Sequence, residues 1–197
     1  DAILELLNRR AEVSLEVGRR KAGSNEPIFK PFREQEVLAR LAASNKGPLP
    51  NEHLRVIYRE ILSSSRRLQR PEKVVYLGPE GTFSHFAAMA YLGHSVEFEP
   101  KPGIEDVFAA VASRQAELGM VPLENSLQGA VGQSLDLFMR YDVFVQAEVF
   151  SKISHSLLSK SPDMASVTTI YSHPHPLAQC AGWLRANMPE AKLVPVE

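Results

Sequence analysis

The chain changes character near residues 69–73, and this change constrains the fold more than any other feature. Helical periodicity runs through residues 1–70, whereas short apolar runs typical of strands occur only after Lys73. The charge changes at the same place: residues 1–70 carry 14 Lys and Arg against 9 Asp and Glu, and residues 71–197 carry 8 against 14. Pro71 favours a helix end there. We therefore expect two domains, a helical one over 1–70 and an α/β one over 73–197.

The overall composition excludes several classes of protein. Hydrophobic residues make up 44% and charged residues 23% of the 197, which is typical of a globular chain. No apolar run reaches the roughly 18 residues that a membrane span needs, and the start at Asp1 lacks the pattern of a signal peptide. The single cysteine, Cys180, cannot form an internal disulfide or a Cys-based zinc site. We expect a cytoplasmic protein that does not contact a membrane.

The first 70 residues predict three helices. Apolar residues recur at spacings of three and four over 1–22, 32–44 and about 51–69. A bundle this small buries little surface by itself, and a first helix of about 33 Å would extend beyond its shorter neighbours. We therefore predict that two copies pair through this segment as a homodimer.

Cations interrupt the apolar stripe of the first helix at Arg10 and Lys21, which are eleven residues apart and share one side. Arg33, Ser65 and Gln69 lie on or beside apolar faces of the other two helices. Buried cations need anionic partners, which favours a small bound anion, but the same pattern fits cations that extend from the stripe edge into water. Interspersed acids and the lack of an aromatic platform argue against nucleic-acid binding.

The remaining residues predict an α/β domain. Helices are expected after the turn at 78–84, over 104–115 and over 176–187. The runs that read as strands are 74–77, 96–99, 118–121, 142–150, 153–158, 167–171 and 193–196.

Three of these strands end in polar or glycine-containing loops, over 78–84, 122–126 and 172–175. Ligands of open α/β sheets collect at the carboxyl ends of strands, so the pattern predicts one cleft lined by the three loops. The turn at 78–84 lacks both nucleotide-binding glycine motifs, and no cofactor is expected. His173 and His175 could ligate zinc, but no third ligand is evident. Helix capping by Thr82, Ser84 and Ser126 remains an alternative.

Four ordered segments resemble the motifs of prephenate dehydratases. The first is the Tyr-Leu-Gly-Pro-Glu-Gly-Thr-Phe-Ser sequence of residues 76–84, and the others are 124–137, 153–158 and 172–180. The helical segment resembles the all-helical chorismate mutases, notably at 6–10, 17–21, 33–34 and 57–69. Together they resemble the bifunctional chorismate mutase–prephenate dehydratases of phenylalanine biosynthesis, also called P-proteins.

The mutase resemblance implies that chorismate rearranges to prephenate without a nucleophile or proton relay, held by preorganised donors. In matching the family's motifs, Arg10 corresponds to a carboxylate-binding arginine and Lys21 to the lysine that contacts a carboxylate and the ether oxygen. Gln69 corresponds to the second donor to that oxygen. Glu34 corresponds to the acceptor for the substrate hydroxyl. Arg33 and Ser65 correspond to two further residues that line the same pocket. Lys30 departs from the family, which often has an acid there.

The dehydratase resemblance implies a two-lobed fold like that of periplasmic binding proteins, in which prephenate loses water and carbon dioxide to give phenylpyruvate. The expected catalytic residues are Thr82, Glu124 and Asn125, and the expected substrate-binding residues are Ser84, Ser126, Ser172 and His173. By the same resemblance, a mutase arginine would precede Asp1, and a Thr-Arg-Phe motif and a regulatory ACT domain would follow Glu197, so we expect a chain shortened at both ends. The alternative from another class is a non-catalytic module that senses a carboxylate and dimerises through its helices.

Overall fold

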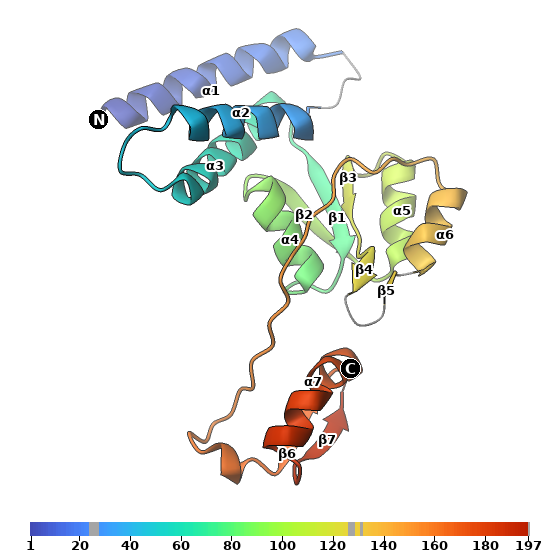
Figure 1. Ribbon diagram of the computed structural model, residues 1–197. Helices are drawn as coiled ribbons and strands as arrows, with labels where there is room; N and C mark the ends of the chain where they lie inside the picture. The colour runs from blue at the N-terminus through green and yellow to red at the C-terminus, as the bar shows by residue number, and fades with distance from the viewer. Residues whose placement is uncertain (24–27, 126–128, 131, 197) are drawn as a thin grey trace. The chain divides into compact units, whose positions relative to one another are not determined.

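The computed structural model describes residues 1–23, 28–125, 129–130 and 132–196 (Figure 1). Contacts divide the chain into two compact units, Asp1–Ser151 and Lys152–Glu197. The first unit contains three helices followed by a parallel sheet with its helices, and the second contains a smaller strand–helix–strand element. This mixed helical and α/β architecture is the one that the sequence predicts.

The three N-terminal helices are α1 (Ala2–Lys21), α2 (Pro31–Ser44) and α3 (Asn51–Gln69). Asp1 caps α1, because its carboxylate accepts a 3.0 Å hydrogen bond from the Ile3 N–H. Glu5 in the first turn and Arg19–Lys21 in the last complement the helix dipole. Pro31 occupies the first turn of α2, where its missing N–H costs nothing.

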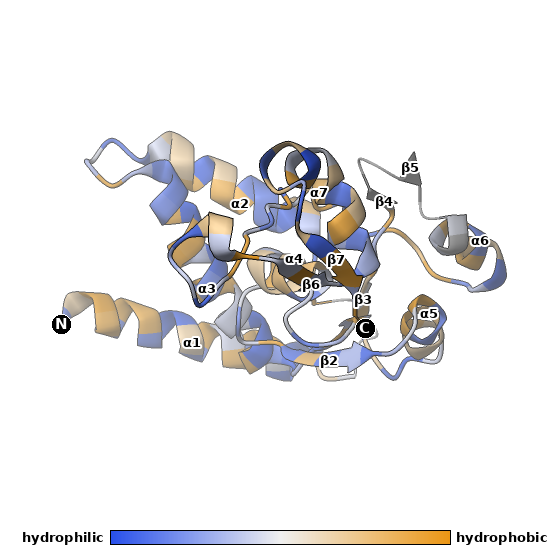
Figure 2. Cartoon of the chain, turned by 90° about the horizontal axis from the view of Figure 1, so that it is seen from below, coloured by the Kyte–Doolittle hydropathy of each residue, from blue (hydrophilic) through white to orange (hydrophobic). Residues whose placement is uncertain are grey.

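Helices α1 and α3 pack closely. A Cβ added to Gly18 of α1 would lie 2.7 Å from the carbonyl oxygen of Gln69, so only glycine permits this approach. The amino-terminal half of α1 leaves apolar side chains exposed, and they colour much of this helix orange in Figure 2. None of the described helices is both long enough and apolar enough to pass through a membrane.

The sheet of the first unit has the order β2-β1-β3, with all strands parallel. These strands are β1 (Lys73–Leu77), β2 (Glu97–Lys101) and β3 (Leu118–Met120). The central strand is buried at Val74, Val75 and Tyr76, as expected for a parallel strand covered on both faces.

Helices α4 (Phe83–Leu92) and α5 (Ile104–Ala112) are the crossovers between these strands. Val107 of α5 packs on Val75 in one core cluster, and Phe29 joins Val74 and Leu92 in another. Phe29 lies between α1 and α2 in the sequence, so the helical segment contributes to the same core as the sheet. The short strands β4 (Glu124–Asn125) and β5 (Gly129–Ala130) pair antiparallel before α6 (Gly132–Arg140).

The second unit pairs β6 (Thr169–Ser172) with β7 (Lys192–Pro195) in parallel. Helix α7 (Pro174–Asn187) connects them, and a short 3₁₀ helix, Met164–Ser166, precedes β6. Its core is formed by Ile170, Leu184 and Met188.

Two of the expected strands are wrong. Residues 142–150 and 153–158 have no regular secondary structure, and Phe144, Phe150 and Leu158 are 78%, 87% and 89% exposed. A strand forms only where a neighbour offers backbone and side-chain partners, and no strand pairs with these runs in the described ranges. The expected helix over 104–115 ends early at Ala112, because Arg114 adopts a φ of 60° that breaks it.

Candidate functional site

The seam between α1 and α3 brings together several of the expected mutase residues. The Arg10 Nε donates a 3.3 Å hydrogen bond to the Ser65 Oγ. Gln69, one turn further along α3, donates from Nε2 to the Ser65 carbonyl at 3.2 Å. Ser14, one turn after Arg10, is buried and donates to the Arg10 carbonyl at 3.0 Å. Arg10, Ser65 and Gln69 therefore line one short stretch of the seam.

Lys21 and Arg33 lie at the ends of their helices. Lys21 is the last residue of α1 and is partly buried, three residues after the Gly18 that contacts Gln69. Arg33 lies in the first turn of α2 and is exposed. Among the described residues, no hydrogen bond joins Arg33 to Arg10, Ser65 or Gln69.

Glu34 is engaged by Arg66, a residue that the sequence analysis missed. The Arg66 side chain is 4% exposed, and its Nη1 lies 2.5 Å from Glu34 Oε1. Its Nε lies 3.1 Å from Glu72 Oε2, its Nη2 donates to the Leu92 carbonyl, and the guanidinium stacks on Phe29 at 5.0 Å. Arg66 follows the buried Leu62 by one turn of α3. An arginine at a core position of this helix was the sequence feature that could have predicted a buried ion pair.

Burial raises the pKa of Glu72, although its attraction to Arg66 acts in the opposite direction. The cluster of Arg66, Glu34 and Glu72 therefore holds one buried cation against two carboxylates at the junction between α3 and β1. Such clusters tolerate the removal of a single member poorly.

The turn between β1 and α4 is ordered by Thr82 and His85. The Thr82 Oγ1 donates to the Leu77 carbonyl at 3.1 Å and accepts from the His85 N–H at 3.4 Å, so it caps α4. The Gly81 N–H donates to His85 Nδ1 at 3.1 Å, and the His85 ring stacks on Tyr76 at 4.6 Å. Sequence reasoning offered the cap as one interpretation of Thr82 but found no role for His85. Ser84 lies in the first turn of α4 and is partly buried.

The second expected loop contains β4 and β5. Glu124 pairs with Ala130 and Asn125 with Gly129 in the ladder, and the predicted Ser126 lies outside the described residues. Ser134 of α6 is buried and donates to the Pro122 carbonyl at 2.7 Å, which anchors the chain just before β4.

The remaining expected residues belong to the second unit. Ser172 ends β6, and His173 caps α7 by accepting the His175 N–H on its Nδ1 at 3.3 Å. His155 Nε2 lies 2.5 Å from Gln179 Oε1, which joins two of the four motif segments inside this unit. Within the described ranges, no three His, Cys, Asp or Glu side chains are grouped to hold a metal ion.

Comparison with protein families finds two matches along the chain. The family model for prephenate dehydratase matches residues 74–197, and the model for chorismate mutase type II matches residues 1–70.

Curated relatives cover the whole chain and carry both descriptions. Proteins named bifunctional chorismate mutase/prephenate dehydratase from Aquifex aeolicus (strain VF5) and Stutzerimonas stutzeri are 40% and 43% identical over 201 and 202 residues. The match covers 100% of this chain in both cases, but 56% and 55% of the relatives. The chain thus spans about half the length of the curated relatives it matches. A solved structure of prephenate dehydratase from Arthrobacter aurescens, in complex with L-Phe, aligns with a TM-score of 0.46 at 23% identity, covering 63% of this chain and 42% of that one.

Proposed function

Because this chain belongs to the prephenate dehydratase family and carries a type II chorismate mutase segment ahead of it, we propose that the protein performs both reactions in phenylalanine biosynthesis. The first converts chorismate to prephenate, and the second removes water and carbon dioxide from prephenate to give phenylpyruvate. We propose that residues 1–70 form the mutase domain and residues 73–197 belong to the dehydratase domain.

The observation that carries the mutase proposal is the packing of α1 on α3, where Arg10 meets Ser65 and Gln69 follows one turn later. In this proposal Arg10 binds a substrate carboxylate, while Lys21 and Gln69 donate to the ether oxygen as its bond to carbon breaks. Donors held in place before the reaction stabilise that developing charge without reorganising. Arg33 and Ser65 complete the pocket.

In this proposal the Glu34 Oε2 accepts a hydrogen bond from the substrate hydroxyl. Its Oε1 is already bound by Arg66, which restrains the carboxylate on α2. This restraint supports the proposed role, because a positioned acceptor orients the folded substrate with less loss of entropy on binding.

For the dehydratase reaction, we propose that Thr82, Glu124 and Asn125 act on the departing hydroxyl group. Loss of that group requires a proton donor or strong hydrogen bonding at its oxygen. The turn beside Thr82 is ordered, through His85, at the carboxyl end of β1, where open α/β sheets bind ligands. Prephenate binding is assigned to Ser84, Ser126, Ser172 and His173.

A homodimer is part of this proposal. Ile3, Leu4 and Leu6 on the first turns of α1 are 69%, 57% and 66% exposed, which is a large apolar surface for a single helix. A second copy packed along α1 would cover these side chains. The cytoplasm remains the proposed location.

The test is to incubate the full-length protein with chorismate and follow chorismate loss and phenylpyruvate formation. Both signals are expected. Binding of prephenate with no conversion of either compound would instead favour the alternative function, a module that senses carboxylates.

A further inference from the structure

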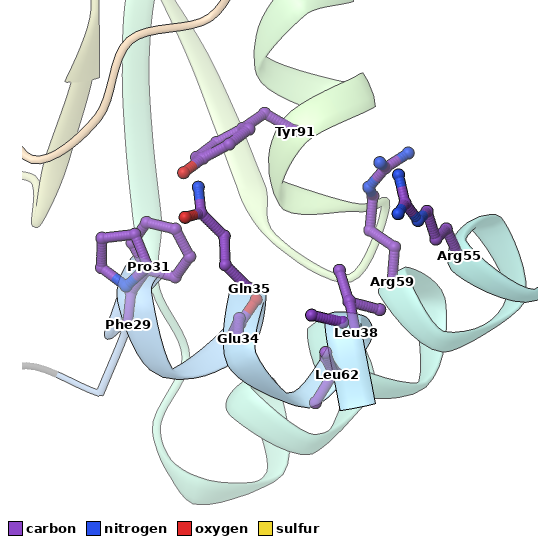
Figure 3. Close-up of a pocket in the computed structure, with 10 residues that line it drawn as sticks. Phe29, Pro31, Glu34, Gln35, Leu38, Arg55, Arg59, Leu62 and Tyr91 are labelled. Atoms are coloured by element: carbon purple, nitrogen blue, oxygen red, sulfur yellow. The ribbon is translucent and has the colours of Figure 1, made fainter. Parts of the chain in front are cut away.

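A pocket of about 330 Å³ lies between α2, α3 and α4 of the first unit (Figure 3). Its volume falls at the lower end of the range for small-molecule sites. Glu34, proposed above for the mutase reaction, lines this pocket, whereas Arg10, Lys21, Gln69 and Thr82 are not among its described lining residues.

One wall of this pocket carries two arginines. Arg55 and Arg59 are one turn apart on α3, and their guanidinium groups lie beside each other in Figure 3. Like charges at this spacing repel each other. In the part of the chain that the structure describes, neither guanidinium forms an ion pair.

Two acids close to this wall, Glu60 and Glu34, already have other partners. Glu60, which follows Arg59, has its Oε1 2.9 Å from the His94 Nδ1, and its Oε2 accepts the His94 N–H at 3.1 Å. Glu34, on the facing helix, has its Oε1 on the buried Arg66. Within the described ranges, the arginine wall therefore carries positive charge that no ion pair compensates, and an anion in the pocket would relieve the repulsion.

The rest of the pocket suits an apolar ring. Leu38 and Leu62 lie below the arginines in Figure 3, and Phe29 and Tyr91 pack edge to face with their centroids 5.9 Å apart. Burial raises the pKa of Tyr91, so its hydroxyl stays a hydrogen-bond donor at neutral pH. That hydroxyl and the Gln35 amide face each other in the same view, which places a polar group at the far side from the cations.

We propose that this pocket is an accessory site for a small ring-containing carboxylate, with the carboxylate on Arg55 and Arg59 and the ring against Leu38, Leu62 and Tyr91. The pocket shares Glu34 with the proposed mutase site, but the cations proposed to hold chorismate, Arg10 and Lys21, do not line it. A bidentate arginine contact supplies charge recognition, and the apolar walls discriminate against simple inorganic anions.

The test uses 3-phenylpropionate as the probe, titrated into the full-length protein and followed by calorimetry and by NMR saturation transfer. R55Q/R59Q should weaken binding at least tenfold, because the substituted wall keeps its hydrogen bonding but loses its charge. R40Q, an exposed arginine of α2 outside the pocket, is the matched control and should bind like the parent. K21A should also bind normally, which separates this pocket from the proposed mutase site.

A second variant tests the cavity without touching its charge. L38W should fill the space and abolish binding while circular dichroism shows an intact fold. Equal affinity of R55Q/R59Q and the parent, or loss of binding in K21A but not in R55Q/R59Q, would overturn the proposal. Inorganic phosphate binding as tightly as 3-phenylpropionate would overturn the ring-acid assignment.

Discussion

The guanidinium of Arg66 lies 2.5 Å from the carboxylate of Glu34, although 32 residues separate the two in the chain. The same guanidinium binds Glu72, just before β1, and the Leu92 carbonyl at the end of α4. One buried cation thus joins the helix α2 of the proposed mutase segment to the first strand and helix of the dehydratase family region. Glu34, the proposed acceptor of the substrate hydroxyl, is therefore held in place by Arg66, which is itself buried.

Replacing Arg66 by Met should destabilise the protein strongly. The variant leaves Glu34 and Glu72 without their shared cation in a buried place, and the loss of one partner of a buried pair costs about 3–5 kcal/mol. The free energy of unfolding from urea titration measures this. Arg67→Met is the matched control, because Arg67 is exposed and makes one 3.3 Å hydrogen bond to the Ser95 carbonyl. This variant should lose only about 0.5 kcal/mol of the free energy of unfolding. Similar losses in both variants would show that the Arg66 cluster is not a strong contributor.

Replacing Lys21 by Ala should lower the mutase rate on the order of 100-fold or more, as loss of a preorganised oxyanion donor does. Arg20→Ala is the matched control one position earlier, since Arg20 points outward and pairs with Glu16 at 2.8 Å. Initial rates of chorismate consumption by the full-length protein measure both. An unchanged rate in Lys21→Ala would end the assignment of this residue.

Replacing Gly18 by Ala should force α1 away from α3. The added methyl would meet the Gln69 carbonyl oxygen at 2.7 Å and its Cα at 2.8 Å, and these backbone atoms cannot move as a side chain could. We expect a loss of about 1–3 kcal/mol in the free energy of unfolding, as for overpacked cores, together with a lower mutase rate. Gly182→Ala in α7 is the control, because its added Cβ would meet no described atom within 4 Å apart from the adjacent residues and the backbone of its own helix. That variant should gain about 0.5–1 kcal/mol from helix propensity, so equal effects at the two glycines would contradict the packing argument.

The sequence predicted the elements whose signal is local and missed the features that depend on distant partners. The three N-terminal helices and the turn after β1 follow from periodicity and glycine placement, so their bounds were close to those in the structure. Residues 142–150 and 153–158 were predicted as strands because they are apolar, but among the described residues no strand pairs with them. The engagement of Glu34 by Arg66, and the stacking of His85 on Tyr76, involve residues brought together by folding, which periodicity does not report.

The pair of Glu60 and His94 predicts a pH dependence of stability. Burial opposes ionisation of Glu60, but hydrogen bonds from the His94 ring and backbone outweigh it and hold the pKa of this carboxyl below its ordinary value of 4.5. The folded-state pKa is thus lower than the unfolded one. Ionised Glu60 therefore stabilises the fold above about pH 4.5, and this contribution is lost as the pH falls through the folded-state pKa.

Glu60→Gln should consequently unfold at a lower temperature than the parent at pH 7. The difference should shrink as the pH falls from 4.5 towards the folded-state pKa, because the carboxyl binds a proton in the unfolded chain before it does so in the folded one. Thermal unfolding followed by circular dichroism at pH 7, 5 and 4 measures the trend. In a double-mutant cycle, His94→Ala should remove only the part of the Glu60 stabilisation that the imidazole ring supplies. The rest should remain, because the backbone N–H of residue 94 still donates to Glu60. The unfolding temperatures of Glu60→Gln and the parent could instead differ by the same amount from pH 7 to pH 4. That result would contradict a role for the ionised carboxyl and leave only side-chain packing as the contribution of Glu60.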